Sequence, residues 1–149
     1  MSENILVCAA WPYANGSLHL GHIAGCYLPA DIFARYNRLK GNNVLMVSGS
    51  DAHGTPVTIT AESQGTTPEK VSSSYQREFL SDWKSLGISF DLFTSTHTDN
   101  HSKVAQDIFL RLYEKGFIYK DRMSQPYCEA HLRFLADRYV EGTCPHCGF

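Results

Sequence analysis

The sequence predicts an α/β domain with a mostly parallel sheet, and two observations lead to this fold class. Short apolar runs, typical of buried strands, alternate with longer segments whose apolar residues recur at helical spacing. Polar loops follow the apolar runs, as they do at the carboxyl ends of parallel strands. The 149 residues, 43% of them hydrophobic and 19% charged, are enough to enclose a hydrophobic core.

The first predicted strand comes within ten residues of the N-terminus. Residues 5–10 form a continuous apolar run, which we expect to be a strand buried on both faces. Asn15-Gly16 predicts a turn in the loop that follows. From about Leu20 the spacing is helical as far as Gly41, and Pro29 should bend or break this helix.

The next elements continue the alternation of strand and helix. Residues 43–48 predict a second buried strand, and residues 49–56 a polar loop after it. The later expected elements are a helix from Thr55-Pro56 to about Gln64, a helix from Thr67 to Leu86, a strand over 88–94 and a helix from Thr98-Asp99 to about Lys115.

Composition separates two regions and limits the location of the protein. We expect residues 1–116 to form the α/β unit and residues 117–149, rich in Pro, Cys and His, to begin a separate loop-rich insertion. The formal net charge of -2 does not indicate a basic nucleic-acid-binding arm. Neither a signal peptide nor an apolar run of membrane-spanning length is visible, so we expect a cytoplasmic protein with no membrane partner.

Five cysteines, an odd number, argue against a disulfide framework. Cys8 and Cys26 stand in apolar contexts and are expected to be buried thiols.

Cys144 and Cys147 lie in Cys-Pro-His-Cys-Gly, a turn typical of zinc knuckles. A redox Cys-x-x-Cys is the alternative, but it would stand on a strand-to-helix turn, which this segment lacks. Cys128 and His131 have the same two-residue spacer and could supply the other two ligands of one structural zinc ion, or could belong to a second knuckle or to none.

The loop after the first strand carries the strongest functional pattern. His19 and His22 are spaced to lie on one face of a first helical turn, with Gly21 between them. Two imidazoles at that place can donate hydrogen bonds to phosphate oxygens and stabilise the charge of departing pyrophosphate, and the glycine could let a flat ring such as adenine approach. The alternatives are two structural histidines, or a metal site that would lack neighbouring carboxylates.

His19-Leu20-Gly21-His22 resembles the first signature motif of the class I aminoacyl-tRNA synthetases. The longer segment Pro12–His22 resembles the methionyl branch of that family, and Gly49–Pro56 matches a second segment of the same branch. The resemblance covers essentially the whole chain. It implies the first half of a Rossmann-like catalytic domain, which activates methionine with ATP, with Mg²⁺ expected, to methionyl-adenylate and pyrophosphate, and then transfers methionine to tRNA.

The resemblance also assigns roles to individual residues. The catalytic residues would be His19 and His22. The residues that bind ATP would be His19, Gly21 and His22. The residues that bind the amino acid would be Ala10, Trp11, Tyr13 and Asp51. Asp51 would hold the substrate ammonium, as a carboxylate in a partly dry pocket can, although a turn or cap role is the alternative. Many family members have Leu where this chain has Trp11. His53 could orient its loop or contact ATP.

One family signature is missing from these residues. A loop like Lys-Met-Ser-Lys-Ser does not occur, and Arg122-Met123-Ser124-Gln125 lacks both lysines and precedes the zinc segment. In the family a second Cys-x-x-Cys would follow shortly after Cys147. We therefore expect a truncated, inactive fragment whose tRNA contacts lie mainly elsewhere. The competing hypotheses are a sister synthetase for a branched aliphatic amino acid, a small nucleotidyltransferase and a non-enzymatic zinc module.

Overall fold

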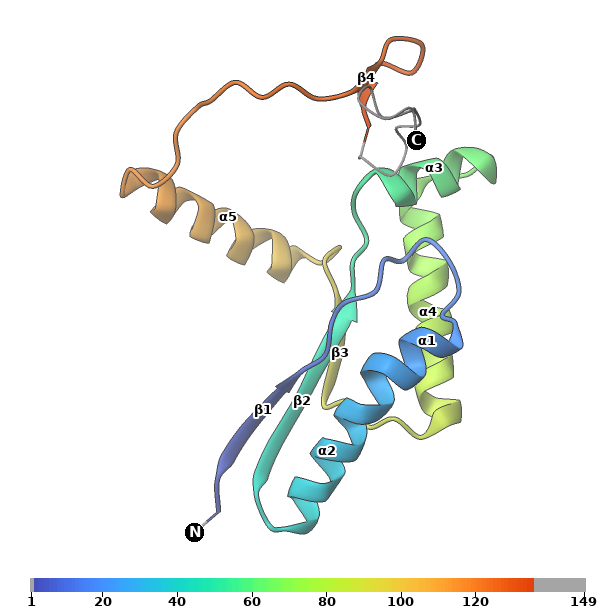
Figure 1. Ribbon diagram of the computed structural model, residues 1–149, viewed down its shortest axis with the longest axis vertical. Helices are drawn as coiled ribbons and strands as arrows, with labels where there is room; N and C mark the ends of the chain where they lie inside the picture. The colour runs from blue at the N-terminus through green and yellow to red at the C-terminus, as the bar shows by residue number, and fades with distance from the viewer. Residues whose placement is uncertain (1, 136–149) are drawn as a thin grey trace, which may run out of the picture. The chain divides into compact units, whose positions relative to one another are not determined.

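The computed structural model describes residues 2–135 (Figure 1). Their elements, in chain order, are β1 Asn4–Cys8, α1 Leu20–His22, η1 Ile23–Tyr27, α2 Leu28–Leu39, β2 Asn43–Ser50, α3 Thr55–Ser63, α4 Pro68–Leu86, β3 Leu92–Ser95, α5 Asp99–Glu114, β4 Tyr127–Cys128 and β5 Arg133–Phe134. The backbone divides into two compact units between Gln106 and Asp107. The domain boundary that we predict after residue 116 stays a prediction. None of the helices in the described range is both long enough and apolar enough to cross a membrane.

The first unit is built on a three-stranded parallel sheet in the order β1-β2-β3. β1 pairs with β2 from Asn4 opposite Asn43, and β2 pairs with β3 from Val47 opposite Leu92. The predicted parallel sheet is therefore confirmed. All three strands end at the same edge, so the loops that follow them come together there (Figure 1).

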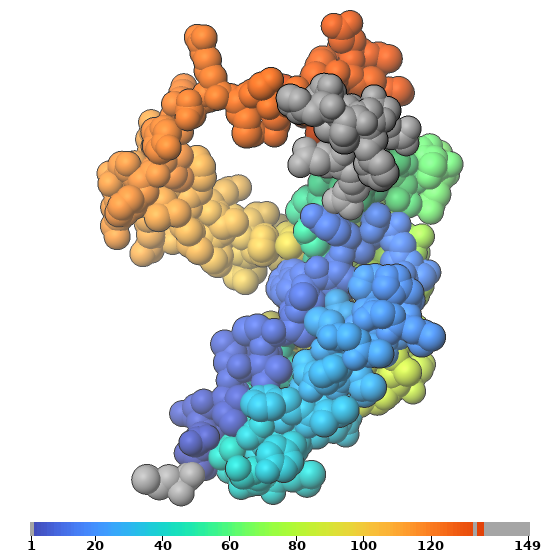
Figure 2. All heavy atoms as spheres, viewed as in Figure 1, coloured from blue at the N-terminus to red at the C-terminus, as the bar shows by residue number. Residues whose placement is uncertain are grey.

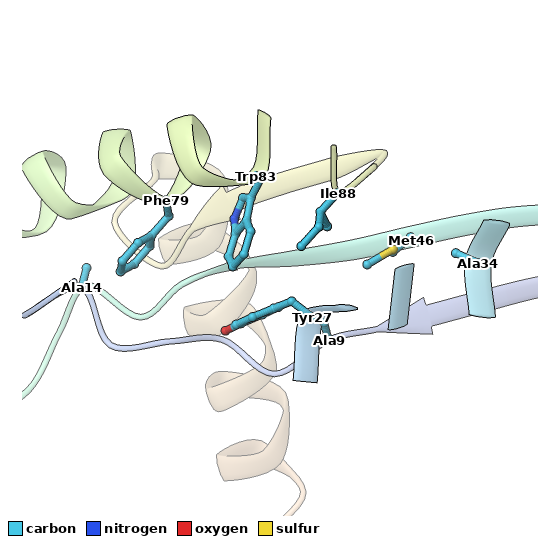
Figure 3. Close-up of a cluster of buried hydrophobic side chains, with 8 residues drawn as sticks. All are labelled: Ala9, Ala14, Tyr27, Ala34, Met46, Phe79, Trp83 and Ile88. Atoms are coloured by element: carbon cyan, nitrogen blue, oxygen red, sulfur yellow. The ribbon is translucent and has the colours of Figure 1, made fainter. Parts of the chain in front are cut away.

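Aromatic side chains fill the space between the sheet and its helices (Figure 3). The rings of Tyr27 and Trp83 lie 4.5 Å apart between centroids, and Phe79 and Met46 are fully buried beside them. Rings of this size bury large apolar areas, and such pairs add roughly 0.5–1.5 kcal/mol beyond their burial. This cluster holds η1, α2 and α4 against one face of the sheet.

The prediction that β1 is buried on both faces is wrong. Ile5 and Val7 are half-buried, whereas Leu6 is 62% exposed and Cys8 is exposed. Successive side chains of a strand point to opposite faces, and the helices of the core cluster cover one face only. Figure 2 shows the dark-blue atoms of β1 next to the light-blue atoms of α2. The prediction that Cys8 and Cys26 are buried thiols is also wrong. Cys8 lies on the uncovered face of β1 and is exposed, and Cys26, in η1, is half-buried.

Pro29 does not break the helix, because α1, η1 and α2 follow one another without interruption from Leu20 to Leu39. It stands at the start of α2, immediately after the π-helical turn η1. The Leu28 N–H donates to the Ile23 carbonyl, five residues back, in the π-helical pattern. Proline has no N–H to donate to the preceding turn, and the wider π-helical turn stands where this α-helical bond is lost.

The third strand begins later than the predicted residue 88. The N–H and hydroxyl of Ser89 both donate to the Asp31 carboxylate at 2.7 Å, so this backbone is bonded to α2 and not to β2. β3 therefore starts only at Leu92.

Candidate functional site

The two predicted site loops lie side by side at the carboxyl end of the sheet. Tyr13 and Asp51 form an isolated parallel bridge beyond the ends of β1 and β2. The Asp51 N–H donates to the Pro12 carbonyl, and the Ala14 N–H donates to the Asp51 carbonyl, both at 2.8 Å. Segments far apart in the sequence thus share one edge, which is where ligands bind in open α/β sheets.

Ala10 is held by two side chains from the core. Its carbonyl accepts hydrogen bonds from the Tyr27 hydroxyl at 3.0 Å and from the Ser48 hydroxyl at 3.2 Å. Burial, with a smaller contribution from Cys26, raises the pKa of Tyr27, so its hydroxyl keeps its proton and remains a donor. The backbone at the start of the first loop is therefore fixed in place.

Trp11 lies over the backbone of β2 and remains partly open to solvent. A Cβ added at Gly49 would stand 2.8 Å from the indole ring and 2.8 Å from the Thr94 carbonyl oxygen, so only glycine fits there. Trp11 is 39% exposed, and its ring lies 6.2 Å from the His101 ring between centroids. Trp11 thus offers one apolar surface next to the Asp51 loop.

Asp51 is half-buried, and its side chain has turn character. One carboxylate oxygen accepts the His53 N–H at 3.3 Å, which is the bond of an Asx turn. A carboxylate has about four acceptor positions, so this single weak bond leaves capacity for a substrate ammonium. The turn role and the binding role are therefore compatible in one residue.

His19 and His22 brace the start of the helix with one ring nitrogen each. His19 Nδ1 accepts the Gly21 N–H at 3.0 Å, and His22 Nδ1 accepts the His19 N–H at 3.3 Å, which makes a reciprocal capping box. The two rings are stacked 3.8 Å apart. Because Nδ1 is the acceptor in both neutral rings, Nε2 carries the proton, and each exposed histidine presents an Nε2–H donor.

Gly21 is close to the ring of His19. A Cβ at this position would stand 2.9 Å from His19 Cε1 and 3.0 Å from His19 Nδ1. The glycine therefore makes room for the histidine of the same motif. The Gly21 N–H is already bonded to His19, whereas the two imidazoles can each offer an Nε2–H donor to a phosphate.

Three residues that sequence reasoning missed follow the third strand. Thr96 Oγ1 accepts the Ala52 N–H at 2.8 Å, and the His97 ring packs edge-on against His53 with centroids 5.6 Å apart. His101, on α5, approaches Trp11 as described above. Loops at the carboxyl ends of parallel strands share one edge of the sheet. The same rule, applied to the loop after the third strand, could have found these residues.

The hairpin β4–β5 brings two of the predicted zinc ligands together. Cys128 Sγ lies 3.2 Å from His131 Nδ1, and hydrogen bonds from His131 lower the pKa of the Cys128 thiol. Cys144 and Cys147 lie outside the described residues. Within residues 2–135, no three His, Cys, Asp or Glu side chains cluster closely enough to hold a metal ion.

Residues 5–149 match the family described as tRNA synthetases class I (M). The chain belongs to this family. It is 65% identical over its full 149 residues to the methionine–tRNA ligase of Thermomicrobium roseum, of which it covers 26%. The chain thus spans about a quarter of the length of the curated relatives that it matches.

Two solved synthetases share the fold. The methionyl-tRNA synthetase of Mycobacterium tuberculosis, in complex with methionyl-adenylate, matches 96% of this chain and 28% of its own at 29% identity, with a TM-score of 0.80. The AgnB2 LeuRS of Agrobacterium radiobacter K84, in a ternary complex with tRNA and LeuAMS, matches 99% of this chain and 20% of its own at 28% identity, with a TM-score of 0.81. The fold alone therefore does not separate the methionyl from the leucyl branch, whereas the 65% identity places this class I synthetase chain with the methionine–tRNA ligases.

Proposed function

We propose that the protein is a cytoplasmic methionine–tRNA ligase. The observation that carries the proposal is the bridge between Tyr13 and Asp51, which joins the histidine loop to a carboxylate in a chain so similar to known methionine–tRNA ligases. One loop presents donors suited to a triphosphate, and the other presents an acceptor suited to an ammonium. That combination fits the joining of ATP to an amino acid.

The amino acid would lie at the sheet edge. Asp51 pairs with the substrate ammonium, and Ala10, Trp11 and Tyr13 surround the remainder of methionine. A half-buried carboxylate suits this role because a charge-assisted hydrogen bond is about twice as strong as a neutral one. Trp11 supplies apolar area for an uncharged thioether side chain.

ATP, as its Mg²⁺ complex, would meet the two histidines. A methionine carboxylate oxygen attacks the α-phosphorus, a new P–O bond forms, and the bond to pyrophosphate breaks with its electron pair leaving on the pyrophosphate oxygen. The Nε2–H groups of His19 and His22 donate to the phosphate oxygens as this charge develops. A ribose hydroxyl of tRNA then attacks the acyl carbon of methionyl-adenylate and releases AMP.

Amino-acid-dependent exchange of pyrophosphate into ATP tests the proposal. We would compare methionine with leucine, isoleucine and valine, on the 149-residue chain and on the longest product of its gene. Exchange driven by methionine alone in the longest product supports the assignment, and we expect the 149-residue chain to be inactive. Exchange driven instead by leucine, isoleucine or valine, or by none of the four, would contradict it.

We also propose a structural zinc ion in the insertion that begins at about residue 117. Cys144 and Cys147 would be two ligands, with Cys128 and His131 as candidates for the other two. Thiolate and imidazole are the donors that zinc prefers, and the 3.2 Å between Cys128 Sγ and His131 Nδ1 is short enough for one ion to bind both. The ion would fix the fold of this segment and take no part in the reaction.

Metal content per chain, measured by mass spectrometry, tests the zinc proposal. We expect Cys144→Ser and Cys147→Ser to abolish bound zinc, and Cys128→Ser to lower it if that residue is a ligand. Cys26→Ser is the matched control, because Cys26 packs on the core of the α/β unit. Full zinc content in Cys144→Ser would overturn the proposal.

A further inference from the structure

The residue that follows β3 is bonded to both neighbours of Asp51. The Thr96 N–H donates to the Ser50 carbonyl at 3.0 Å, and Thr96 Oγ1 accepts the Ala52 N–H at 2.8 Å. Thr96 thus spans Asp51 with one backbone bond and one side-chain bond. The side-chain bond is the one that a substitution can remove.

These bonds complete the fixation of Asp51. On the β1 side, its N–H and carbonyl are both bonded to the first loop, through Pro12 and Ala14. On the β3 side, the peptide that follows it is held by Thr96. The backbone that carries the carboxylate is therefore bonded to both neighbouring strand ends.

The bond between Thr96 and Ala52 lies in a buried part of the turn, so its loss would not be compensated by water. Ala52 is 5% exposed and Ser50 is fully buried, so little water can reach this peptide to replace a lost acceptor. A buried N–H without a partner would pull the turn toward another acceptor and move the residue before it. Asp51 is that residue.

We propose that Thr96 is a positioning residue: through the Ala52 N–H it sets the place of the Asp51 carboxylate against the substrate ammonium. The inference rests on the proposed function, in which Asp51 binds methionine. Thr96 itself need touch no substrate. A substitution of Thr96 should therefore change the KM for methionine. It should leave the KM for ATP unchanged, because ATP is proposed to bind at the His19–His22 turn.

Steady-state exchange kinetics of the longest gene product test this. Thr96→Val keeps the shape and removes the acceptor, and Thr96→Ser keeps the acceptor. We expect Thr96→Val to raise the KM for methionine roughly tenfold, because a displaced Asp51 carboxylate makes a weaker charge-assisted bond to the ammonium. We expect the KM for ATP to stay unchanged and Thr96→Ser to be near the wild type.

Thr67→Val is the matched control. Thr67 Oγ1 also accepts a backbone N–H, that of Lys70, but at the start of α4 and outside the site. Its loss should lower thermal stability and leave both KM values unchanged. If Thr96→Val likewise lowered thermal stability and left the KM for methionine unchanged, Thr96 would have only a structural role, and the inference would be overturned.

A double-mutant cycle with Asp51→Asn separates the two hypotheses. If Thr96 acts through Asp51, Thr96→Val adds little to Asp51→Asn; additive effects on the methionine KM would overturn the inference. Should Thr96→Val fail to fold, Thr96→Ala removes the same acceptor with less bulk and is judged by the same criteria. An active wild type with an unaffected Thr96→Val contradicts only this inference, whereas a wild type without methionine-dependent exchange contradicts the proposed function itself.

Discussion

His19 and His22 use one ring nitrogen for the fold and leave the other for chemistry. Their Nδ1 atoms accept backbone N–H groups at the start of α1, and this fixes the tautomer in which Nε2 carries a proton. A pair of structural histidines and a pair of phosphate-binding histidines are therefore not exclusive alternatives. The capping box orients the same donors that the proposed reaction requires.

His19→Asn separates these two roles. Asparagine is a favourable N-cap whose side-chain oxygen can accept the Gly21 N–H, but it has no group at the position of Nε2. We expect the free energy of unfolding to change by less than about 0.5 kcal/mol, and the exchange rate at saturating substrate to fall roughly 100-fold. Denaturant unfolding and exchange kinetics measure the two quantities.

The control for this prediction is His19→Ala, which removes both nitrogens. It should cost about 1 kcal/mol of stability through the lost cap, with the same loss of rate. Wild-type exchange by His19→Asn would show that the Nε2–H of this residue does not stabilise the reaction.

At the scale of elements, α2 is tied to the segment before β3 through a buried carboxylate. Asp31 is 4% exposed and accepts two hydrogen bonds from Ser89 and one from Arg35. Burial by itself raises the pKa of Asp31, but the hydrogen bonds from Ser89 and Arg35 outweigh it and hold the pKa below its usual value. Folding thus favours the ionised form, and this bond network replaces the early part of the strand predicted from residue 88.

The lowered pKa predicts an acid-sensitive stability. The pKa of Asp31 is lower in the folded state than in the unfolded state, where it is about 3.9. Ionised Asp31 therefore contributes fully to the free energy of unfolding at pH values above the unfolded-state pKa. This contribution is lost as the pH falls through the folded-state pKa. We expect Asp31→Asn to cost about 1–3 kcal/mol near neutral pH and to flatten the decline in acid. Denaturant unfolding at a series of pH values measures both.

Asp107→Asn is the matched control for the acid prediction. Asp107 also pairs with an arginine four residues on, Arg111, but both side chains are more than half exposed. Surface pairs of this kind contribute little, so its pH profile should follow the wild type. An unchanged acid profile in Asp31→Asn would show that the buried network is not the source of the dependence.

At the scale of the whole molecule, one face of the sheet carries apolar side chains that the described residues 2–135 leave exposed. Leu6 of β1 and its register partner Leu45 of β2 are 62% and 51% exposed, on the face opposite the core helices. β1 is also an edge strand of the described sheet. Exposed apolar faces and unpaired edges favour association with another chain.

We expect the 149-residue polypeptide, expressed alone, to self-associate through this face. Leu6→Lys places a charge at its centre and should lower the apparent mass measured by analytical ultracentrifugation. Leu86→Lys is the control, since Leu86 is also about half exposed, at 51%, but lies at the end of α4. If Leu86→Lys dissociated the chain as well as Leu6→Lys, the face would not be the site of association.

The sequence by itself determined the order of the elements and the two site loops. Periodicity and turn chemistry are local, so the strands near residues 5 and 43, the helix that Thr67 caps and the glycine that ends it could be read from neighbours alone. The resemblance to the synthetase family assigned Tyr13 and Asp51 to one amino-acid site, and the structure joins the two residues at the shared edge of the parallel sheet.

Only the tertiary structure decided what depends on contacts between distant residues. Each of three features requires a partner from another element: the burial of β1 on one face, the late start of β3 at Leu92, and the bond from the Ala52 N–H to Thr96 Oγ1. The same holds for Gly49, which must be glycine because the Thr94 carbonyl oxygen and the Trp11 ring both lie too close for a Cβ. A local sequence pattern indicates which secondary structure a segment favours. Tertiary packing decides which of its side chains are buried, which are hydrogen-bonded and which are positioned to bind a substrate.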